Sequence, residues 1–420
     1  MSAARRVAVI TAVCAIADAS MADRIEAQSA PNDSARAARD HYRAAVQANR
    51  AHDLDAAWLA ANRAAAMWPA QIAYRSTVAL LAARRGDAPA LTTALRGLAV
   101  FEAGADILSD SAIMRMSAAP DVANAISALR ASVRDVVRSD AFITLRDSTM
   151  FPEGMDVDAR TGNVYVGSIR HRTVLERRPD GTERELFARG QPNLGGVFGV
   201  RVDPKGGVLW ATTSTEVNAE GATAGEPQIA ALLQVRIADG VILRRWDVPA
   251  SPTGHTLGDL AVAASGDVFV TDSRSPFVYR LRRGADTLET ITNPLFRSLQ
   301  GVAPTSDGRA LYLADYSHGL LRLDLASGTV RVLEHDASFS VLGLDGIALH
   351  RGSIVAVQNG VAPARVVRYT LDASGTRIIK VTTLDRNPVA DEPTIGAIAN
   401  GAFVYVANSS GRSTVRPERA

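Results

Sequence analysis

The stretch LGDLAVAASGDVFVTDSRSPFVYRL, residues 257–281, decides the fold of this chain. It contains three short apolar runs, at 257–262, 267–272 and 277–281, and each is separated from the next by glycine, serine or proline. Runs of this length that are rich in valine and aromatic residues and bounded by turn residues predict β-strands. The stretch therefore predicts three consecutive strands joined by tight turns.

The same outline occurs six times between residues 151 and 408. The copies share one outline: a small or acidic residue with a glycine, then an apolar strand, a turn, and a second apolar strand that ends in a polar residue. The copies follow one another at steps of about 45, 60, 42, 45 and 50 residues. Their first strands contain Glu153-Gly154, Phe198-Gly199, Gly258-Asp259, Gln300-Gly301, Asp345-Gly346 and Thr394-Ile395-Gly396.

A four-stranded unit that recurs every forty to fifty residues is typical of a β-propeller blade. The sequence therefore predicts a mainly β fold, a six-bladed β-propeller over residues 141–420. Because the last repeat is short of strands, we expect Phe142–Arg146, ahead of the first blade, to supply its outer strand. The long second step contains the glycine- and alanine-rich segment 216–227, which predicts a surface loop able to cover the central channel.

Residues 29–140 have a different composition, rich in alanine, leucine and arginine and poor in glycine. Apolar residues such as Tyr42, Val46, Trp58 and Ala61 are spaced for amphipathic helices, so we expect a small all-α domain of helical hairpins. The 32 residues from Tyr42 to Tyr74 are close to the period of a tetratricopeptide repeat, which the segment resembles. Two interpretations remain open: a groove for a protein partner, and helices that only pack as a bundle or against the propeller.

The first 28 residues have the layout of a secretory signal peptide. Arg5 and Arg6 precede an apolar run at 7–17, and small residues follow at Ala17 and Ala19. We therefore expect a periplasmic or secreted protein; the alternative is a buried N-terminal helix. The apolar run is too short for a stable membrane span. Removal of this segment would also remove Cys14, the only cysteine, which excludes disulfides and thiolate metal sites from the mature chain.

The charge balance points away from nucleic acid as a partner. The chain has 46 basic and 44 acidic residues, a formal net charge of +2, whereas nucleic-acid-binding domains carry a basic excess. The composition, 47% apolar and 21% charged, is that of an ordinary globular protein. We expect the partner at the propeller to be a small molecule.

Candidate site residues lie where each inner strand begins, because these positions project into the mouth of a propeller channel. They are Glu153, Phe198, Gly258 or Asp259, Gln300, Asp345 and Thr394. Carboxylate and amide oxygens that converge from different blades are the ligands preferred by hard cations such as calcium. Two neighbouring carboxyl groups also shift each other's proton affinity, which suits acid–base catalysis. The alternative is that each residue only bonds its own turn.

Residues 142–410 resemble the regucalcin–gluconolactonase family of six-bladed, calcium-dependent hydrolases. Glu153-Gly154 and Asp345-Gly346 match that family's acidic ligands on its first and fifth blades. Gln300-Gly301 stands where the family usually has asparagine before glycine, and Gly258 with Asp259 stands where it has another asparagine. The resemblance implies calcium or another divalent cation held by Glu153, Asp259, Gln300 and Asp345, with Asp345 also acting as general base.

Two functional hypotheses follow. In the first, the exported propeller hydrolyses a lactone or ester at its axial mouth, using the cation, Asp345 and, as a proton carrier, His255 on the loop before the third inner strand. The alternative for His255 is that it is a solvated loop residue without a catalytic role. In the second hypothesis the propeller is a non-catalytic platform that binds a ligand or protein, and the helical domain holds a protein partner.

Overall fold

The computed structural model describes residues 33–203, 205–223 and 225–409. The predicted signal segment, residues 1–28, lies outside the described residues. The chain divides into two units. The first extends to Asp135 and also includes Asp336–Leu342 and Val361–Pro363, whereas the second begins at Val136 and contains the remainder. The division falls five residues before the boundary expected at 140–141.

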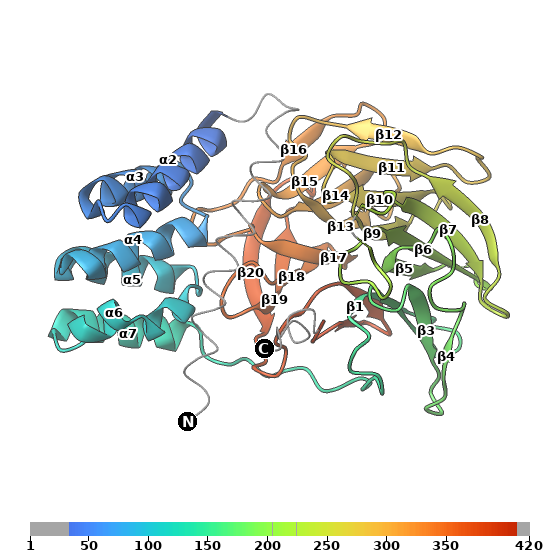
Figure 1. Ribbon diagram of the computed structural model, residues 1–420, viewed down its shortest axis with the longest axis horizontal. Coiled ribbons are helices and arrows are strands. Elements are labelled where there is room, and N and C mark those ends of the chain that lie inside the picture. Colours follow the sequence, from blue (N-terminus) through green and yellow to red (C-terminus); the bar gives the residue numbers. More distant parts are fainter. Residues whose placement is uncertain (1–32, 204, 224, 410–420) are drawn as a thin grey trace. The chain divides into compact units, whose positions relative to one another are not determined.

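The first unit is built from α-helices arranged as antiparallel pairs (Figure 1). Capping explains the helix ends. Asp53 and Asp87 accept hydrogen bonds from backbone N–H groups three residues later, and Gly86 adopts a φ of +70° to end a helix. The helices are α2 (Asp33–Arg50), α3 (Leu54–Met67), α4 (Ile72–Arg85), α5 (Ala88–Val100), α6 (Ser111–Met116) and α7 (Pro120–Ser132), with a 3₁₀ turn η1 (Ala105–Ser109).

The core of this unit lies between the second and third helix pairs. Leu91, Leu95 and Leu98, one turn apart along α5, are fully buried there with Leu129 of α7. The loop segment Val361–Pro363, assigned to this unit, joins the same core, since Val361 packs in it and Gly104 N donates to Ala362 O at 2.7 Å.

The second unit is a β-propeller with five four-stranded antiparallel sheets, each in sequential order (Figure 1). The prediction of a mainly β propeller after a small helical region is confirmed. Blade 1 contains β1 (Pro152–Val157), β2 (Val164–Ser168), β3 (Thr173–Arg177) and β4 (Glu183–Glu185); blade 2 contains β5 (Gly196–Val202), β6 (Val208–Ser214), β7 (Ala230–Arg236) and β8 (Ile242–Asp247). Blade 3 contains β9 (Leu257–Val262), β10 (Val268–Asp272), β11 (Phe277–Leu281) and β12 (Glu289–Thr292); blade 4 contains β13 (Leu299–Pro304), β14 (Ala310–Asp315), β15 (Gly319–Asp324) and β16 (Val330–Val332). Blade 5 contains β17 (Leu344–His350), β18 (Ser353–Gln358), β19 (Arg365–Leu371) and β20 (Ile378–Asp385).

The prediction of six blades is wrong, because the structure has five complete ones. The last repeat forms only a two-stranded sheet, β21 (Gly396–Ala399) with β22 (Ala402–Tyr405). The expected outer strand at 142–146 is also wrong, since no strand forms there. Ile143 and Leu145 instead pack as partly buried loop side chains, as Val404 does, against a cluster that includes Met155 and Ala399. Burial of these side chains covers the short sheet without adding ladder hydrogen bonds to it.

The inner strands nevertheless form a complete ring. β1, β5, β9, β13, β17 and β21 contact one another in that order, and β21 contacts β1. Glycine permits this close approach: a Cβ on Gly154 would lie 2.3 Å from Phe198 O, and one on Gly301 would lie 2.5 Å from Ile347 N. Each blade therefore places its inner backbone directly against the next.

Candidate axial site

The inner strand of each of the five blades has the same backbone irregularity near its start. Its pairing with the next strand shifts after the first residue pair in blades 1, 3, 4 and 5, and after the second pair in blade 2. A bulge of this kind re-aims side chains and is common beside functional sites. The residues carried by the bulges include Glu153, Gln300 and Asp345, which the sequence analysis singled out.

Asp345 is buried, with 8% of its surface exposed, and its carboxylate has one neutral partner. Asn359 Nδ2 donates to Asp345 Oδ2 at 2.7 Å and also to Pro393 O at 3.0 Å. Burial raises the pKa of Asp345 to about 7, and the charges of Asp259 and Glu392 contribute, while the Asn359 hydrogen bond opposes the rise. A carboxyl group with this pKa can accept and return a proton near neutral pH.

Glu153 shares the acidic environment of Asp345. Burial raises the pKa of Glu153 well above its ordinary value, and the charge of Asp345 is the next largest cause. Thr394 Oγ1 donates to Glu153 O at 2.8 Å, which joins the last inner strand to the first. The structure therefore brings Glu153, Asp345 and Thr394 into one region at the start of the inner strands. We call Glu153, Gln300, Asp345 and Thr394 the mouth residues.

The side-chain amide of Gln300 in blade 4 forms a hydrogen bond within its own blade. Its Nε2 donates to Ser298 Oγ at 3.2 Å. Its Oε1 lies 3.7 Å from the position that a Cβ on Gly258 would occupy, so the amide oxygen extends toward the third blade. Because Gly258 has no side chain, blade 3 contributes no polar side chain at its own mouth position.

Asp259 occupies the position at which the other blades have glycine, and it forms an ion pair with Arg201. Arg201 Nη2 lies 3.1 Å from Asp259 Oδ1, and Leu260 N donates to the same oxygen at 2.8 Å. Arg201 also donates to Met155 O at 3.0 Å and to Gly396 O at 3.3 Å, so one guanidinium contacts three other inner strands. Asp259 therefore neutralises Arg201 at the centre of the ring.

The sequence analysis missed Arg201. In the sequence, Val200-Arg201-Val202 of β5 shows one polar residue on an otherwise apolar strand. This pattern does not indicate which residues the arginine contacts. Its charge also acts on Asp156, whose carboxylate accepts hydrogen bonds from Val157 N and Val202 N, both at 2.8 Å. We call Asp156, Arg201 and Asp259 the hub cluster.

His255 lies inside blade 3 rather than in solvent. It is 3% exposed, and its Nδ1 lies 2.6 Å from Asp272 Oδ2, with the Tyr279 hydroxyl 3.4 Å away. Its Nε2 is buried without a hydrogen-bond partner among the described residues. The interpretation of His255 as a solvated loop residue is wrong, because Asp272, at the end of β10, draws the ring inward. Its role as a proton carrier stays a prediction.

The long loop between β6 and β7 is fixed to blade 1. Glu220 N donates to Arg170 O at 2.7 Å, and Glu220 Oε2 lies 3.1 Å from His171 Nδ1. The charge of Glu216 raises the pKa of Glu153, so the start of this loop lies near the mouth residues. The side chains of Thr149 and His171 hold the pKa of Asp147, which lies 2.9 Å from His171 Nε2, at about 2.

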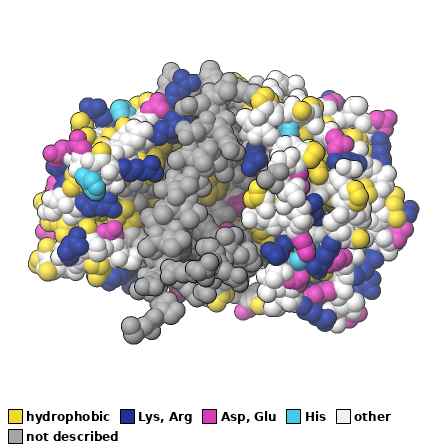
Figure 2. Space-filling view, in the orientation of Figure 1, with side chains coloured by type: hydrophobic (Ala, Val, Ile, Leu, Met, Phe, Trp, Pro, Cys, Tyr) yellow, Lys and Arg dark blue, Asp and Glu magenta, His cyan; other side chains and the backbone are white. Residues whose placement is uncertain are grey.

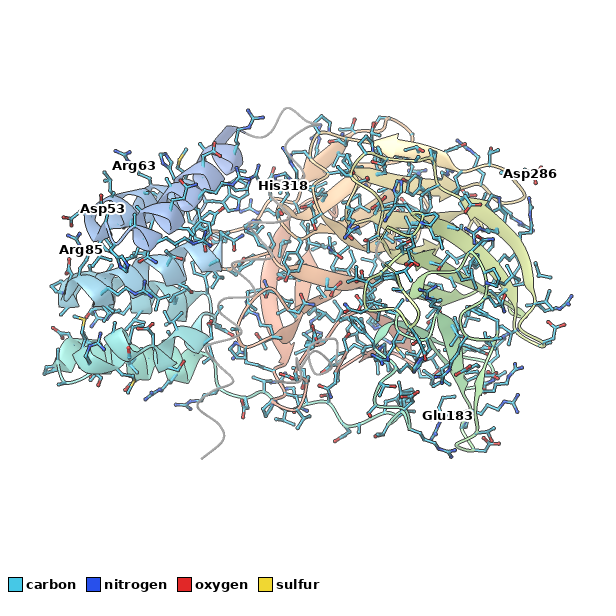
Figure 3. All side chains as sticks on the ribbon, in the orientation of Figure 1. Asp53, Arg63, Arg85, Glu183, Asp286 and His318 are labelled. Atoms are coloured by element: carbon cyan, nitrogen blue, oxygen red, sulfur yellow. The ribbon has the colours of Figure 1, made fainter. Side chains whose placement is uncertain are left out.

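Charges elsewhere are mixed in sign. Basic and acidic side chains are interspersed over the face shown in Figure 2. Glu183 and Asp286, labelled in Figure 3, lie at the outer edge of the propeller and pair with Arg177 and Arg244. These outer acids have counter-charges, whereas Glu153 and Asp345 form no ion pair with a basic side chain of the described residues.

Two observations bear on metal and membrane binding. Within residues 33–203, 205–223 and 225–409, no three His, Cys, Asp or Glu side chains form a group arranged to hold a metal ion. In the same residues no helix combines the length and apolar character needed to cross a bilayer.

Comparisons with known proteins find similarity in structure only. No protein-family model matches the chain. No curated protein matches its sequence. Among solved structures, virginiamycin B lyase from Staphylococcus aureus is 18% identical, with 60% of this chain and 76% of that one covered and a TM-score of 0.44. The calcium-binding protein regucalcin from Agrobacterium tumefaciens is 15% identical, with 60% and 79% covered and a TM-score of 0.44. A luciferin-regenerating enzyme is 15% identical, with 60% and 81% covered and a TM-score of 0.42.

Proposed function

We propose that the propeller is a hydrolase that cleaves a small lactone or ester at its axial mouth, with Asp345 as general base. The observation that supports this most is the buried Asp345 carboxyl group, whose pKa of about 7 matches proton transfer at neutral pH. Its neighbour Glu153 has a raised pKa for the same reasons, burial and like charge. Paired carboxyl groups in such surroundings are typical of acid–base sites.

A divalent cation such as calcium is part of the proposal, and the oxygen atoms near Asp345 fit one. Asn359 Oδ1 is buried without a hydrogen-bond partner among the described residues, while its Nδ2 holds Asp345. Within the described ranges, neither Glu153 nor Asp345 forms an ion pair of the kind that Arg201 forms with Asp259. Two carboxylates with the amide oxygens of Gln300 and Asn359 make a hard-cation donor set, whereas Asp259 is committed to Arg201.

The side chains of the mouth supply the proton transfers. Asp345 Oδ2 accepts from Asn359, which leaves Oδ1 for the proton of a water molecule. The water oxygen bonds to the acyl carbon while its proton passes to Asp345. The acyl–oxygen bond then breaks, and the proton on Asp345 passes to the leaving alkoxide. Water is thereby added across the ester, and Asp345 is restored. A cation bound here supplies Lewis-acid polarisation of the acyl carbonyl.

Calorimetric calcium titration with an assay of lactone hydrolysis tests the proposal. We expect Asp345→Asn and Glu153→Gln to abolish the calcium heat and Asp345→Asn to lower turnover by about 100-fold or more. Asp286→Asn and Glu183→Gln are matched controls at the outer edge and leave both unchanged. If the unmodified protein gives no heat at millimolar calcium and hydrolyses no lactone, the proposal that it is an enzyme is wrong.

A non-catalytic platform is the second candidate, and the hub cluster favours it. Arg201 joins four inner strands into a fixed centre, which suits a rigid recognition surface as well as an enzyme. Under this alternative the mouth binds a small ligand without turnover. Saturable binding of an intact lactone, with no product formed, would decide for it.

Export and a protein partner are further proposals that rest on the sequence. Residues 1–28 would direct the chain to the periplasm or outside the cell, and the paired helices α2–α7 would hold a partner protein. N-terminal sequencing of the protein recovered from periplasmic and culture fractions tests export. A mature chain that still begins at Met1 would contradict cleavage.

A further inference from the structure

A row of polar side chains crosses the outer part of blade 4. In the antiparallel pairing, Tyr312 of β14 faces Arg322 of β15, and Arg322 faces Arg331 of β16. Like charges directly opposite each other in a sheet destabilise it. A nearby negative charge offsets such repulsion, and the charge of Arg322 already lowers the pKa of two neighbouring carboxyl groups, Asp307 and Asp324.

These two acids act on Arg322 from a distance, and no close ion pair with either arginine is present among the described residues. Neither Arg322 nor Arg331 forms a salt bridge with a described carboxylate, and Nε of Arg322 is buried without a hydrogen-bond partner among them. The other side of the Arg322 guanidinium meets the Tyr312 hydroxyl, where it opposes the burial that raises the pKa of Tyr312. Buried guanidinium N–H groups are normally hydrogen-bonded, so Nε of Arg322 is short of an acceptor.

These arginines line a cavity of about 280 Å³. The hydroxyl-bearing residues Ser327, Thr329 and Thr376 line it too, and Val332 and Leu333 add apolar surface. The wall crosses two blades, because Glu334 N donates to Thr376 O at 3.1 Å and Ile378 N donates to Glu334 O at 2.8 Å. The cavity therefore lies between blade 4 and blade 5, whose backbones are hydrogen-bonded to each other along its wall.

The acids of the cavity limit which anion it can accept. The Asp324 carboxylate accepts hydrogen bonds from Ala326 N at 3.2 Å and Ser327 N at 2.8 Å, which hold it in its turn. Glu334 is exposed at the rim. With two basic and two acidic side chains around the cavity, a dianion gains little net attraction, whereas one planar monoanion can bridge the guanidinium groups.

We propose that this cavity between blades 4 and 5 binds a small organic monocarboxylate, with Arg322 Nε and the Arg331 guanidinium as donors. The ligand carboxylate offsets the arginine pair, and its short apolar part lies on Val332 and Leu333. This site is separate from the axial mouth and does not depend on the function proposed for it.

Propionate titration of the whole protein, followed by NMR of the arginine Nε–H groups, tests the site. The Arg322 signal is assigned by its absence in Arg322→Lys. We expect propionate to shift it saturably, and neutral propanamide to leave it unchanged. Arg331→Gln weakens binding about tenfold. Arg236→Gln, which removes an exposed arginine paired with Asp239, binds propionate as the unmodified protein does.

Three results would overturn the proposal. One is a signal that does not respond to propionate. Another is an equal shift with sodium chloride at matched ionic strength, which marks general screening. The third is tighter binding of inorganic phosphate than of propionate, which would contradict a monocarboxylate site.

Discussion

The mouth residues and the hub cluster both place acids on the inner strands, and in the part of the chain that the structure describes the positive charge belongs to the hub cluster, as Arg201. Burial raises the pKa of Asp156 and of Asp259, and Arg201 opposes the rise in both. At the mouth, the described group that opposes the rise for Asp345 is the neutral amide of Asn359. The same inner strands therefore carry acids of two kinds: those of the hub cluster lie beside an arginine, and Asp345 lies beside a neutral amide.

The largest effect is expected from removing the hub arginine. Arg201→Met leaves Asp259, which is fully buried, without its counter-charge, and we expect a loss of about 3–5 kcal/mol in the free energy of unfolding. Urea denaturation near neutral pH measures it. Adding Asp259→Asn to the same chain recovers part of the loss, because the unpaired charge is then gone. A loss below about 1 kcal/mol would show that the pair matters little.

At the mouth we expect a substitution to raise the free energy of unfolding rather than lower it. In the folded chain the pKa of Asp345 is about 7, above its unfolded value, so the folded state binds more protons and this group's contribution to stability falls as pH rises toward 7. Asp345→Asn removes that penalty. We expect a gain on the order of 1–3 kcal/mol at about pH 8 and a smaller gain at about pH 5.

Chemical denaturation at the two pH values checks this prediction, with Asp286→Asn as control. Asp286 pairs with Arg244 at the propeller edge, and its carboxylate is 84% exposed, so its replacement changes little at either pH. Destabilisation by Asp345→Asn at the higher pH would contradict the view that the ionised form is penalised.

The smallest effect is expected from replacing Asn359, the neutral hydrogen-bond partner of Asp345. Because the Asn359 hydrogen bond lowers the pKa of Asp345 against burial, Asn359→Ala raises that pKa further. Carboxyl-carbon NMR during a pH titration measures the change. Asn218→Ala, in the loop between β6 and β7, is the matched control. An unchanged or lower pKa in Asn359→Ala would show that the amide does not stabilise the carboxylate.

The sequence predicted the propeller because each repeat encodes its own strands and turns. Glu153, Gln300 and Asp345 could be placed on inner strands for the same reason, since each precedes a glycine at a repeated position. The sequence also indicated that the last repeat is short of strands, but it could not show that residues 142–146 leave the gap open. Whether 142–146 pairs as a strand depends on contacts between the two ends of the ring, and in the structure Ile143 and Leu145 pack, partly buried, against an apolar cluster instead.

Partners distant in the chain explain the remaining differences at the site. Arg201 and Asp259 are 58 residues apart, and Asp345 and Asn359 belong to a strand start and a loop of the same blade. His255 is buried because Asp272, 17 residues later, lies beside its ring. Local spacing marks the polar residues of a propeller mouth, whereas the folded ring decides which of them receive a counter-charge.

The most direct test is the titration of the Asp345 carboxyl carbon in the metal-free protein, with Asp345→Asn identifying its signal. The account predicts a midpoint near pH 7 that falls when calcium is added, since a cation favours the ionised form. A midpoint at about 4, the ordinary value for aspartate, with no response to calcium would contradict a reactive acid at the mouth.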